Sequence, residues 1–134
     1  MRRGATWIDP DYYRQFMYEV LDTPRYLRGT IDVKYSAFTA EWQITGKTQV
    51  RSNNIAAYTT YGTDRVNAYR ILEDSLNFRD VRIYDTVEDA DGKEKRVLNA
   101  KETTLAAQKQ QALRDAFKDW IWKDPERRQA LCQQ

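Results

Sequence analysis

The alternation of apolar and polar residues predicts helices and strands in mixed order along the chain. Asp9-Pro10 is a typical helix start, because an N-cap residue is followed by proline at the first helical position. Apolar residues then recur at helical spacing as far as Leu21. We therefore expect a first helix at about residues 10–21, ended by Thr23-Pro24, since the residue before a proline is disfavoured in the α conformation.

The next two stretches alternate with a period of two, which is typical of half-buried strands. In residues 30–35 the apolar side holds Ile31, Val33 and Tyr35, and in residues 40–45 it holds Ala40, Trp42 and Ile44. A short turn separates the two stretches, which favours an antiparallel hairpin. Beyond residue 47 the pattern weakens, with a break at residues 52–54 before a short apolar stretch at 55–58.

The second half of the chain predicts a helix at about 64–77, with its N-cap at Thr63, and a hairpin from 81–87 and 96–98 with a turn at Asp91-Gly92. Asn99 and Glu102 form a capping box before a long helix at 100–122, whose apolar residues recur at helical spacing. Asp124-Pro125 repeats the start signal for a last helix at 126–134, which has no stop signal, so the chain reads as a fragment cut within an element. The order predicts an α+β fold, an antiparallel sheet of about four strands with helices packed on one face and a long C-terminal helix.

Composition supports a single folded domain over residues 1–134, because the chain is 41% hydrophobic and 13% aromatic. No apolar run approaches the length of a membrane span, and the start does not read as a signal peptide, so we expect a cytoplasmic protein with no membrane partner. The net charge is +2, from 22 basic and 20 acidic residues, which is too small to indicate nucleic-acid binding by itself. Only a local basic patch could do so.

The stretch Gly46-Lys47-Thr48 ends like a phosphate-binding P-loop, but its surroundings disagree. The first glycine of that motif would fall at position 41, where Glu41 stands and would repel a phosphate. Bulky Trp42 and Ile44 follow, and residues 48–53 do not start a helix. We therefore expect a turn at the end of a strand and no nucleotide bound by this chain.

Few residues offer catalytic or metal-binding chemistry. The chain has one cysteine, Cys132, and no histidine, which removes the usual metal ligands and general base. The acidic stretch Asp89 to Gly92 lacks a convincing calcium-loop partner, because Glu102 is better explained as a helix cap. Tyr84 and Asp85 could act as a catalytic acid and base only if they lay together, but strand alternation places them on opposite faces. We expect no catalytic residue, no metal and no cofactor in this chain.

Basic and aromatic residues around the first strands and the central helix are candidates for contacting DNA, since cations neutralise phosphates and exposed rings stack on unpaired bases. The candidates are Arg25, Arg28, Lys34, Lys47, Arg51, Tyr58, Tyr61, Arg65 and Arg70. In the alternative interpretation, the cations cover a solvated face and the tyrosine rings complete the core.

Several stretches together carry a resemblance to a known family, and they cover nearly the whole chain. They are Gly4 to Ile8, Tyr61-Gly62-Thr63-Asp64-Arg65 to Asn77, Val81 to Asp85, Glu102-Thr103 through Trp122, and Asp124-Pro125-Glu126-Arg127-Arg128. The chain resembles a segment of the large helicase and adenine-specific DNA methylase fusions of conjugative elements and phages, including the antirestriction type. In that family the segment is similar to the connector between the methyltransferase domain and the SNF2-like helicase.

The resemblance implies an accessory role beside catalytic domains. The adenine-methylase motif, Asn or Asp followed by Pro-Pro and an aromatic residue, is absent, since Pro10, Pro24 and Pro125 are each isolated. ATP, magnesium and S-adenosylmethionine would belong to the parent protein. The expected function is a non-catalytic domain that assists DNA binding or couples the flanking methyltransferase and helicase domains. The alternative is a structural spacer without DNA contact that docks the helicase through Trp122, Arg127 and Arg128.

Overall fold

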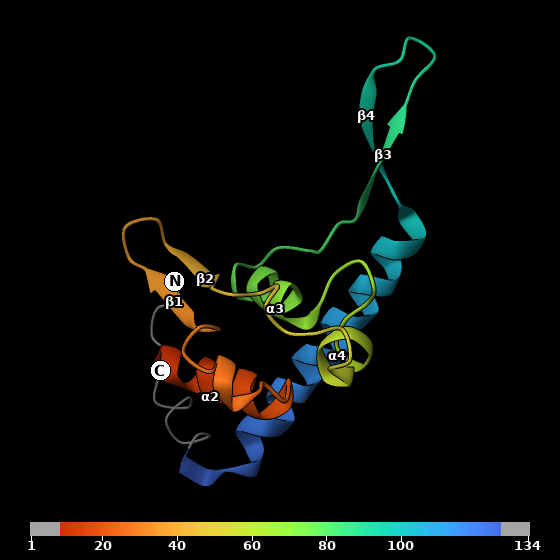
Figure 1. The fold of residues 1–134 in the computed structure, drawn as a ribbon. Coiled ribbons are helices and arrows are strands. Elements are labelled where there is room, and N and C mark those ends of the chain that lie inside the picture. Colours follow the sequence, from red (N-terminus) through yellow and green to blue (C-terminus); the bar gives the residue numbers. More distant parts are fainter. Residues whose placement is uncertain (1–8, 127–134) are drawn as a thin grey trace.

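The computed structural model describes residues 9–126 as an α+β fold (Figure 1). The elements, in chain order, are α2 (Pro10–Val20), a 3-10 helix η1 (Arg25–Leu27), β1 (Val33–Ser36), β2 (Glu41–Ile44), a π-helix η2 (Ala56–Thr60), α3 (Ala68–Leu76), β3 (Tyr84–Glu88), β4 (Glu94–Leu98) and α4 (Ala100–Lys123). The expected α+β class and the long helix near the C-terminal end of the described part are therefore confirmed.

Helix α2 begins and ends close to the predicted bounds. The side chain of Asp9 accepts a hydrogen bond from the backbone N–H of Asp11, and Pro10 takes the first helical position, as the sequence predicts. The helix buries Tyr13, Phe16 and Met17 on one face. This face supplies the α2 side of the hydrophobic core.

Strands β1 and β2 form the predicted antiparallel hairpin, although both are shorter than expected. Val33 pairs with Ile44 and Tyr35 pairs with Trp42, so the apolar residues share the face that turns to the core. The chain turns after Ile44 at Gly46, whose φ of 66° suits glycine, and an added Cβ would lie 2.8 Å from the carbonyl oxygen of Thr30. The Gly46-Lys47-Thr48 stretch is thus a turn after a strand, as expected.

Helix α3 starts four residues later than the sequence predicts. Asn67 is the N-cap, and its side chain accepts hydrogen bonds from the backbone N–H groups of Tyr69 and Arg70. The hydroxyl oxygen of Thr63, which we expected to cap the helix, instead accepts from Arg65 and Val66 in a separate turn. The predicted start at residue 64 is therefore wrong. Thr63 and Asn67 can both cap a helix, but Thr63 closes the preceding turn and Asn67 caps α3.

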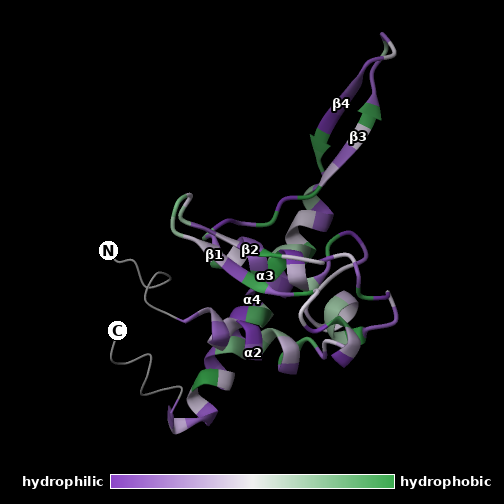
Figure 2. Ribbon diagram, turned by 60° about the vertical axis from the view of Figure 1, so that its left-hand side comes forward, coloured by the Kyte–Doolittle hydropathy of each residue, from purple (hydrophilic) through white to green (hydrophobic). Residues whose placement is uncertain are grey.

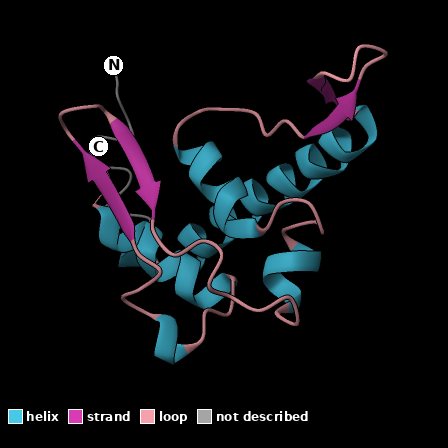
Figure 3. Cartoon of the chain, turned by 45° about the horizontal axis from the view of Figure 1, so that its top comes forward, coloured by secondary structure: helices cyan, strands magenta, loops and turns pink. Residues whose placement is uncertain are grey.

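The four expected strands do not form one sheet. The pair β1–β2 and the pair β3–β4 are two separate antiparallel sheets of two strands each (Figure 3). Val81 and Ile83, which we expected to begin the third strand, are buried in an extended segment that precedes β3. The residues after them are largely exposed, so β3 and β4 leave the body of the molecule as a projecting hairpin (Figure 1).

Helix α4 runs along the whole body and joins the other helices. Asn99 accepts a hydrogen bond from the backbone N–H of Glu102, which confirms the predicted N-cap. The N–H of Asn99 donates to the carbonyl of Ile83, so Glu102 does not complete the predicted capping box. Buried Gln110 donates from its amide nitrogen to the hydroxyl of Ser75 and to the carbonyl of Arg79, and thereby ties α4 to the α3 region. Leu105 belongs to the predicted apolar face of this helix but is 37% exposed.

An aromatic cluster holds α4 against α2 and the first hairpin. The ring of Phe117 stacks on Tyr13 at 5.4 Å between centroids and meets Phe16 edge-on at 5.1 Å. Trp42 meets Tyr13 edge-on at 5.0 Å, and the indole N–H of Trp120 donates to the carboxylate of Glu19 at 3.1 Å. The core therefore lies between α2, the hairpin β1–β2, α3 and α4.

The predicted last helix at 126–134 lies almost entirely outside the described residues. In the described part, no helix combines the length and the hydropathy that crossing a bilayer requires.

Candidate functional site

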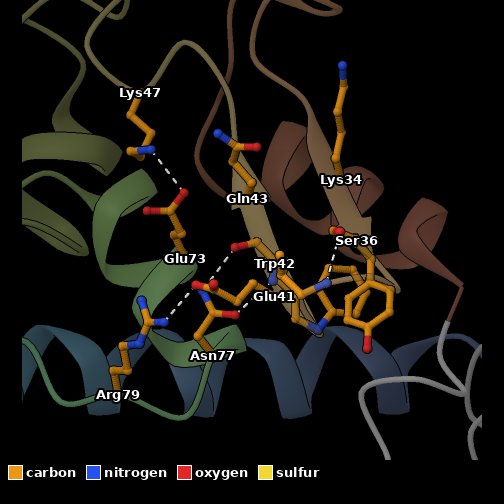
Figure 4. A pocket seen from close by; sticks show the side chains of 11 residues that line it. Lys34, Ser36, Glu41, Trp42, Gln43, Lys47, Glu73, Asn77 and Arg79 are labelled. Atoms are coloured by element: carbon orange, nitrogen blue, oxygen red, sulfur yellow. Dashed lines mark hydrogen bonds and ion pairs between the residues drawn. The ribbon is translucent and has the colours of Figure 1, made fainter.

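A polar cleft lies between the first hairpin and α3 (Figure 4). It has a volume of about 620 Å³. Its floor is the outer face of β1–β2, which carries Lys34, Ser36, Glu41 and Gln43. Its wall is formed by Glu73 of α3, the C-cap residue Asn77 and Arg79. Strand alternation places these polar residues opposite the buried Val33, Trp42 and Ile44.

Side chains of α3 complete the edge of β2 that faces this cleft. The backbone N–H of Trp42 donates to the side-chain oxygen of Asn77 at 2.8 Å, and the Asn77 amide donates back to the carbonyl of Trp42 at 2.9 Å. The N–H of Ile44 donates to a carboxylate oxygen of Glu73 at 2.9 Å. Two helix side chains thus replace the neighbouring strand that an open edge would otherwise accept.

Ion pairs neutralise most of the charge in the cleft. The Lys47 ammonium donates to Glu73 at 2.9 Å and also to the carbonyl of Ile44. Arg79 pairs with Glu41 at 2.8 Å, and the hydrogen bond to that carboxylate raises the pKa of Arg79. Lys34 extends away from these pairs in Figure 4 and has no carboxylate partner among residues 9–126. One uncompensated cation therefore remains in the cleft.

The predicted DNA-contact residues only partly come together. Lys34 and Lys47 line the same cleft, as their strand positions suggested. Glu73, Asn77 and Arg79, which also line the cleft, were not among the predicted residues. The four-residue spacing of Glu73 and Asn77 would have placed them on one face of the central helix, but nothing local indicated that this face meets β2.

Arg25, Arg28 and Arg51 lie outside the cleft. All three are exposed. Arg28 donates to the carbonyl of Thr23 at 3.2 Å and lies over the ring of Tyr18 at 5.2 Å, so its side chain is held against the protein. Arg25 and Arg51 have no carboxylate partner in the described part.

The remaining candidates from the middle of the chain make internal contacts. Tyr58 and Tyr61 are half-buried against the core, and the Tyr58 hydroxyl donates to the carbonyl of Val50 at 3.0 Å. Arg70 pairs with Asp74 at 3.3 Å. Burial raises the pKa of Asp74, although the Arg70 charge opposes that effect. These contacts agree with the alternative interpretation in which the rings complete the core.

Arg65 leads to a second feature, which we call the arm and define as residues 84–98. A guanidinium nitrogen of Arg65 pairs with Asp85 at 2.8 Å, and another donates to the carbonyl of Tyr84 at 3.0 Å. The Asn99 amide donates to the same Asp85 carboxylate at 2.9 Å. Hydrogen bonds from Arg65 and Asn99 lower the pKa of Asp85. The arm is therefore fixed to the body at its base.

Beyond its base the arm has little contact with the body. Every residue of β3 and β4 is exposed except Asp85, which is half-buried. Hydrophilic and hydrophobic residues follow each other along both strands (Figure 2). The tip is acidic, with Glu88, Asp89, Asp91 and Glu94 around a single Lys93. An acidic tip repels phosphates, so the arm does not suit DNA.

Trp122, Arg127 and Arg128 were expected to dock a neighbouring domain. Trp122 is 55% exposed near the end of α4, whereas neighbouring Trp120 is buried. Trp122 therefore does not close the core around Trp120. Arg127 and Arg128 lie outside the described residues.

The acidic stretch at the arm tip is occupied by its own backbone. A carboxylate oxygen of Asp89 accepts hydrogen bonds from the N–H groups of Asp91 and Lys93, both at 2.9 Å. Across residues 9–126 no group of three or more cysteine, aspartate or glutamate side chains is arranged to hold a metal ion.

Comparison with known proteins gives one match. The sequence model of a family described as a domain of unknown function, DUF8437, matches residues 2–134. No curated protein and no solved structure matches the chain. The similarity to helicase and DNA methylase fusions consequently stays a prediction. Because the family match spans nearly every residue, the chain belongs to the DUF8437 family.

Proposed function

We propose that this protein is a non-catalytic accessory module that docks a neighbouring protein domain through its arm. The helicase and methyltransferase domains implied by the sequence resemblance are the candidate neighbours. A cytoplasmic location is part of the same proposal. The observation that carries it is the projection of β3 and β4 from the body (Figure 1).

An isolated two-stranded hairpin has little stability in water unless other protein surface packs on it. Two strands alone are marginally stable, because they bury too little apolar surface to offset the entropy of ordering the chain. The arm has no third strand among the described residues. A partner that covers it would supply the missing burial.

Exposed apolar side chains concentrate on and beside the arm. Of the ten large apolar side chains exposed among residues 9–126, five lie here, namely Tyr84, Val87, Val97, Leu98 and Leu105. The register places Tyr84 and Leu98 on one face of the hairpin and Val87 and Val97 on the other, so each face offers apolar side chains to a partner. The outer edges of β3 and β4 also offer backbone groups to which a partner could add a strand.

The anchored base favours docking further. Arg65, Asp85 and Asn99 fix the direction in which the arm leaves the body. A partner then meets a surface that is already oriented, which reduces the entropy lost on binding.

Hydrogen exchange tests this proposal. The amides of residues 84–98 should exchange rapidly in the chain alone. They should slow at least tenfold when the chain is joined to the methyltransferase and helicase domains of a fusion of the resembling type. Val87→Lys with Val97→Lys should abolish the slowing, while Lys93→Glu with Lys95→Glu, which keeps the apolar groups, should change it less. Equal exchange in both contexts would refute docking through the arm.

DNA contact is the second candidate function, and the uncompensated cations favour it. Lys34, Arg25 and Arg51 are exposed and have no carboxylate partner in the described part, whereas Lys47, Arg65 and Arg70 are each paired. Phosphates would have to displace existing partners from the second group. Lys34 and Arg51 are therefore the informative positions.

A gel shift with single- and double-stranded DNA at low and high salt tests this candidate. If the protein binds DNA, Lys34→Glu with Arg51→Glu should weaken binding and reduce the slope of log K against log salt by about one to two. The matched control is Lys93→Glu with Lys95→Glu on the arm, which changes the net charge equally. Absence of a gel shift at both salt concentrations would refute DNA contact, and docking through the arm would remain as the proposed function.

A further inference from the structure

An apolar groove lies where α2, α3 and α4 meet. It is lined by other residues than the cleft, although Tyr13 of the groove contacts Trp42 of the cleft. Its volume is about 400 Å³, which falls within the range of small binding sites. Its apolar lining consists of Tyr13, Phe16, Leu72, Leu76, Leu113 and Phe117. Phe117 is half-buried and forms the accessible part of the wall, because the other five side chains are buried.

The wall is rigid because aromatic contacts hold it. Phe117 lies between Tyr13 at 5.4 Å and Trp120 at 6.2 Å, with both rings nearly parallel to it, and Phe16 meets its edge. Burial raises the pKa of Tyr13 to about 12, so its phenol stays neutral and adds no charge to the groove. A guest would meet a preformed surface.

The charged residues that line the groove are all basic. Arg114 and Lys118, one helical turn apart on α4, both line the groove, and no carboxylate is among its lining residues. Neither cation has an ion-pair partner in the described part of the chain. An occupant that combines an apolar anchor with flanking carboxylates would bury its anchor and satisfy both cations.

We propose that this groove binds an acidic amphipathic peptide segment of a partner protein, with an aliphatic or aromatic side chain on Phe117 and carboxylates at Arg114 and Lys118. A peptide fits an apolar groove between helices with basic residues at its rim, because an amphipathic helix can place its apolar face in such a groove. This inference does not depend on the arm, since the groove and the arm lie at different ends of α4. Either can fail without the other.

Fluorescence anisotropy with designed probes tests the proposal on the intact chain. The probes are a short labelled peptide with leucines at helical spacing and glutamates between them, the same peptide with glutamine for glutamate, and the same peptide with lysine. We expect saturable binding of the glutamate peptide, at least tenfold weaker binding of the glutamine peptide, and loss of affinity as salt rises. Equal affinity for all three, or binding of none, would overturn the proposal.

Substitutions locate the binding. Arg114→Glu with Lys118→Glu should weaken the glutamate peptide at least tenfold, whereas Lys101→Glu with Lys109→Glu, the same charge change elsewhere on α4, should alter it less than twofold. Arg114→Gln with Lys118→Gln provides a milder pair should the reversals unfold the protein, and thermal melts establish which variants are folded. An unchanged affinity in folded rim variants would remove the groove as the site.

Two further measurements test whether a second copy of the chain or a small amphiphile, instead of a peptide, occupies the groove. Sedimentation of the wild type and of the rim variant reports self-association, and a dimer lost only in the rim variant would replace the peptide by a second copy. The anionic dye 8-anilinonaphthalene-1-sulfonate reports small amphiphiles. Dye binding that depends on the rim, without peptide binding, would mean a small-molecule site and would refute the peptide.

Discussion

At the scale of single residues, Gly62 shows how closely two backbone segments approach. A Cβ at this position would lie 2.0 Å from the carbonyl oxygen of Ala57 and 2.9 Å from the backbone nitrogen of Ala68. Both are backbone atoms, which cannot rotate away as the end of a side chain can. Only glycine fits between the backbone of Ala57 in η2 and the first residue of α3.

We expect Gly62→Ala to destabilise the fold by about 3 kcal/mol or more, because a whole loop must move to relieve the overlap. Gly29→Ala is the control. Its φ is 104° and nothing lies within 4 Å of the added Cβ, so it isolates backbone strain of about 1–2 kcal/mol. Urea unfolding followed by tryptophan fluorescence measures both free energies, and equal losses would contradict the close approach.

Asp74 makes a second prediction at this scale. Burial raises its pKa, so the folded state holds the proton more tightly than the unfolded state. The contribution of this group to stability is then greatest below the unfolded pKa and is lost as the pH rises through the folded pKa. The melting temperature of Asp74→Asn minus that of the wild type should therefore increase between about pH 3 and pH 7. A difference that falls or stays flat would contradict the burial effect.

At the scale of elements, the arm depends on a small anchor. Asp85 is held by Arg65 and Asn99, and its lowered pKa means that the anchor is complete above the unfolded pKa and is lost as the pH falls through the folded pKa. Asp85→Ala should speed amide exchange in residues 84–98 several-fold while the amides of α2 stay protected. Asp91→Ala, which removes a carboxylate from the tip of the same arm, is the matched control. Similar exchange in both variants would mean that the anchor does not orient the arm.

The sequence predicted local signals better than long-range pairing. The caps at Asp9 and Asn99 and the two hairpins followed from residues a few positions apart. Alternation cannot tell which strands share a sheet, so one sheet was expected where there are two. The start of α3 was missed because Thr63 and Asn67 are both good caps.

The candidate site was predicted in the same uneven way. Lys34 and Lys47 were named because they are basic residues in or beside the first two strands. Asn77 was missed because its partner, Trp42, is 35 residues away in the sequence. Ion pairs such as that of Lys47 with Glu73 leave fewer basic residues available to bind phosphates. Such pairs depend on tertiary packing, which composition does not reveal.

At the scale of the whole molecule, α4 is the element to which the rest is attached. Buried Gln110 donates to the carbonyl of Arg79 and to the hydroxyl of Ser75. The Ser75 hydroxyl also bonds the carbonyl of Ile71, so Gln110→Met should leave the Arg79 carbonyl without this donor and cost about 1–3 kcal/mol. Exposed Gln108→Met is the same chemical change without these bonds and should cost less than about 0.5 kcal/mol. Thermal or urea unfolding gives both values, and a neutral Gln110→Met would show that α4 is held by apolar packing alone.

The hydrogen bonds between β2 and the side chains of Asn77 and Glu73 protect one edge of the first hairpin against aggregation. A foreign strand could extend the first hairpin along this side only after displacing both helix side chains. Along β3 and β4, Arg65 covers the carbonyl of Tyr84 at the base, and no third strand pairs with either outer edge in the described part. Concentrated solutions should therefore begin to form fibrils at the arm, and the precipitate should retain a native first hairpin.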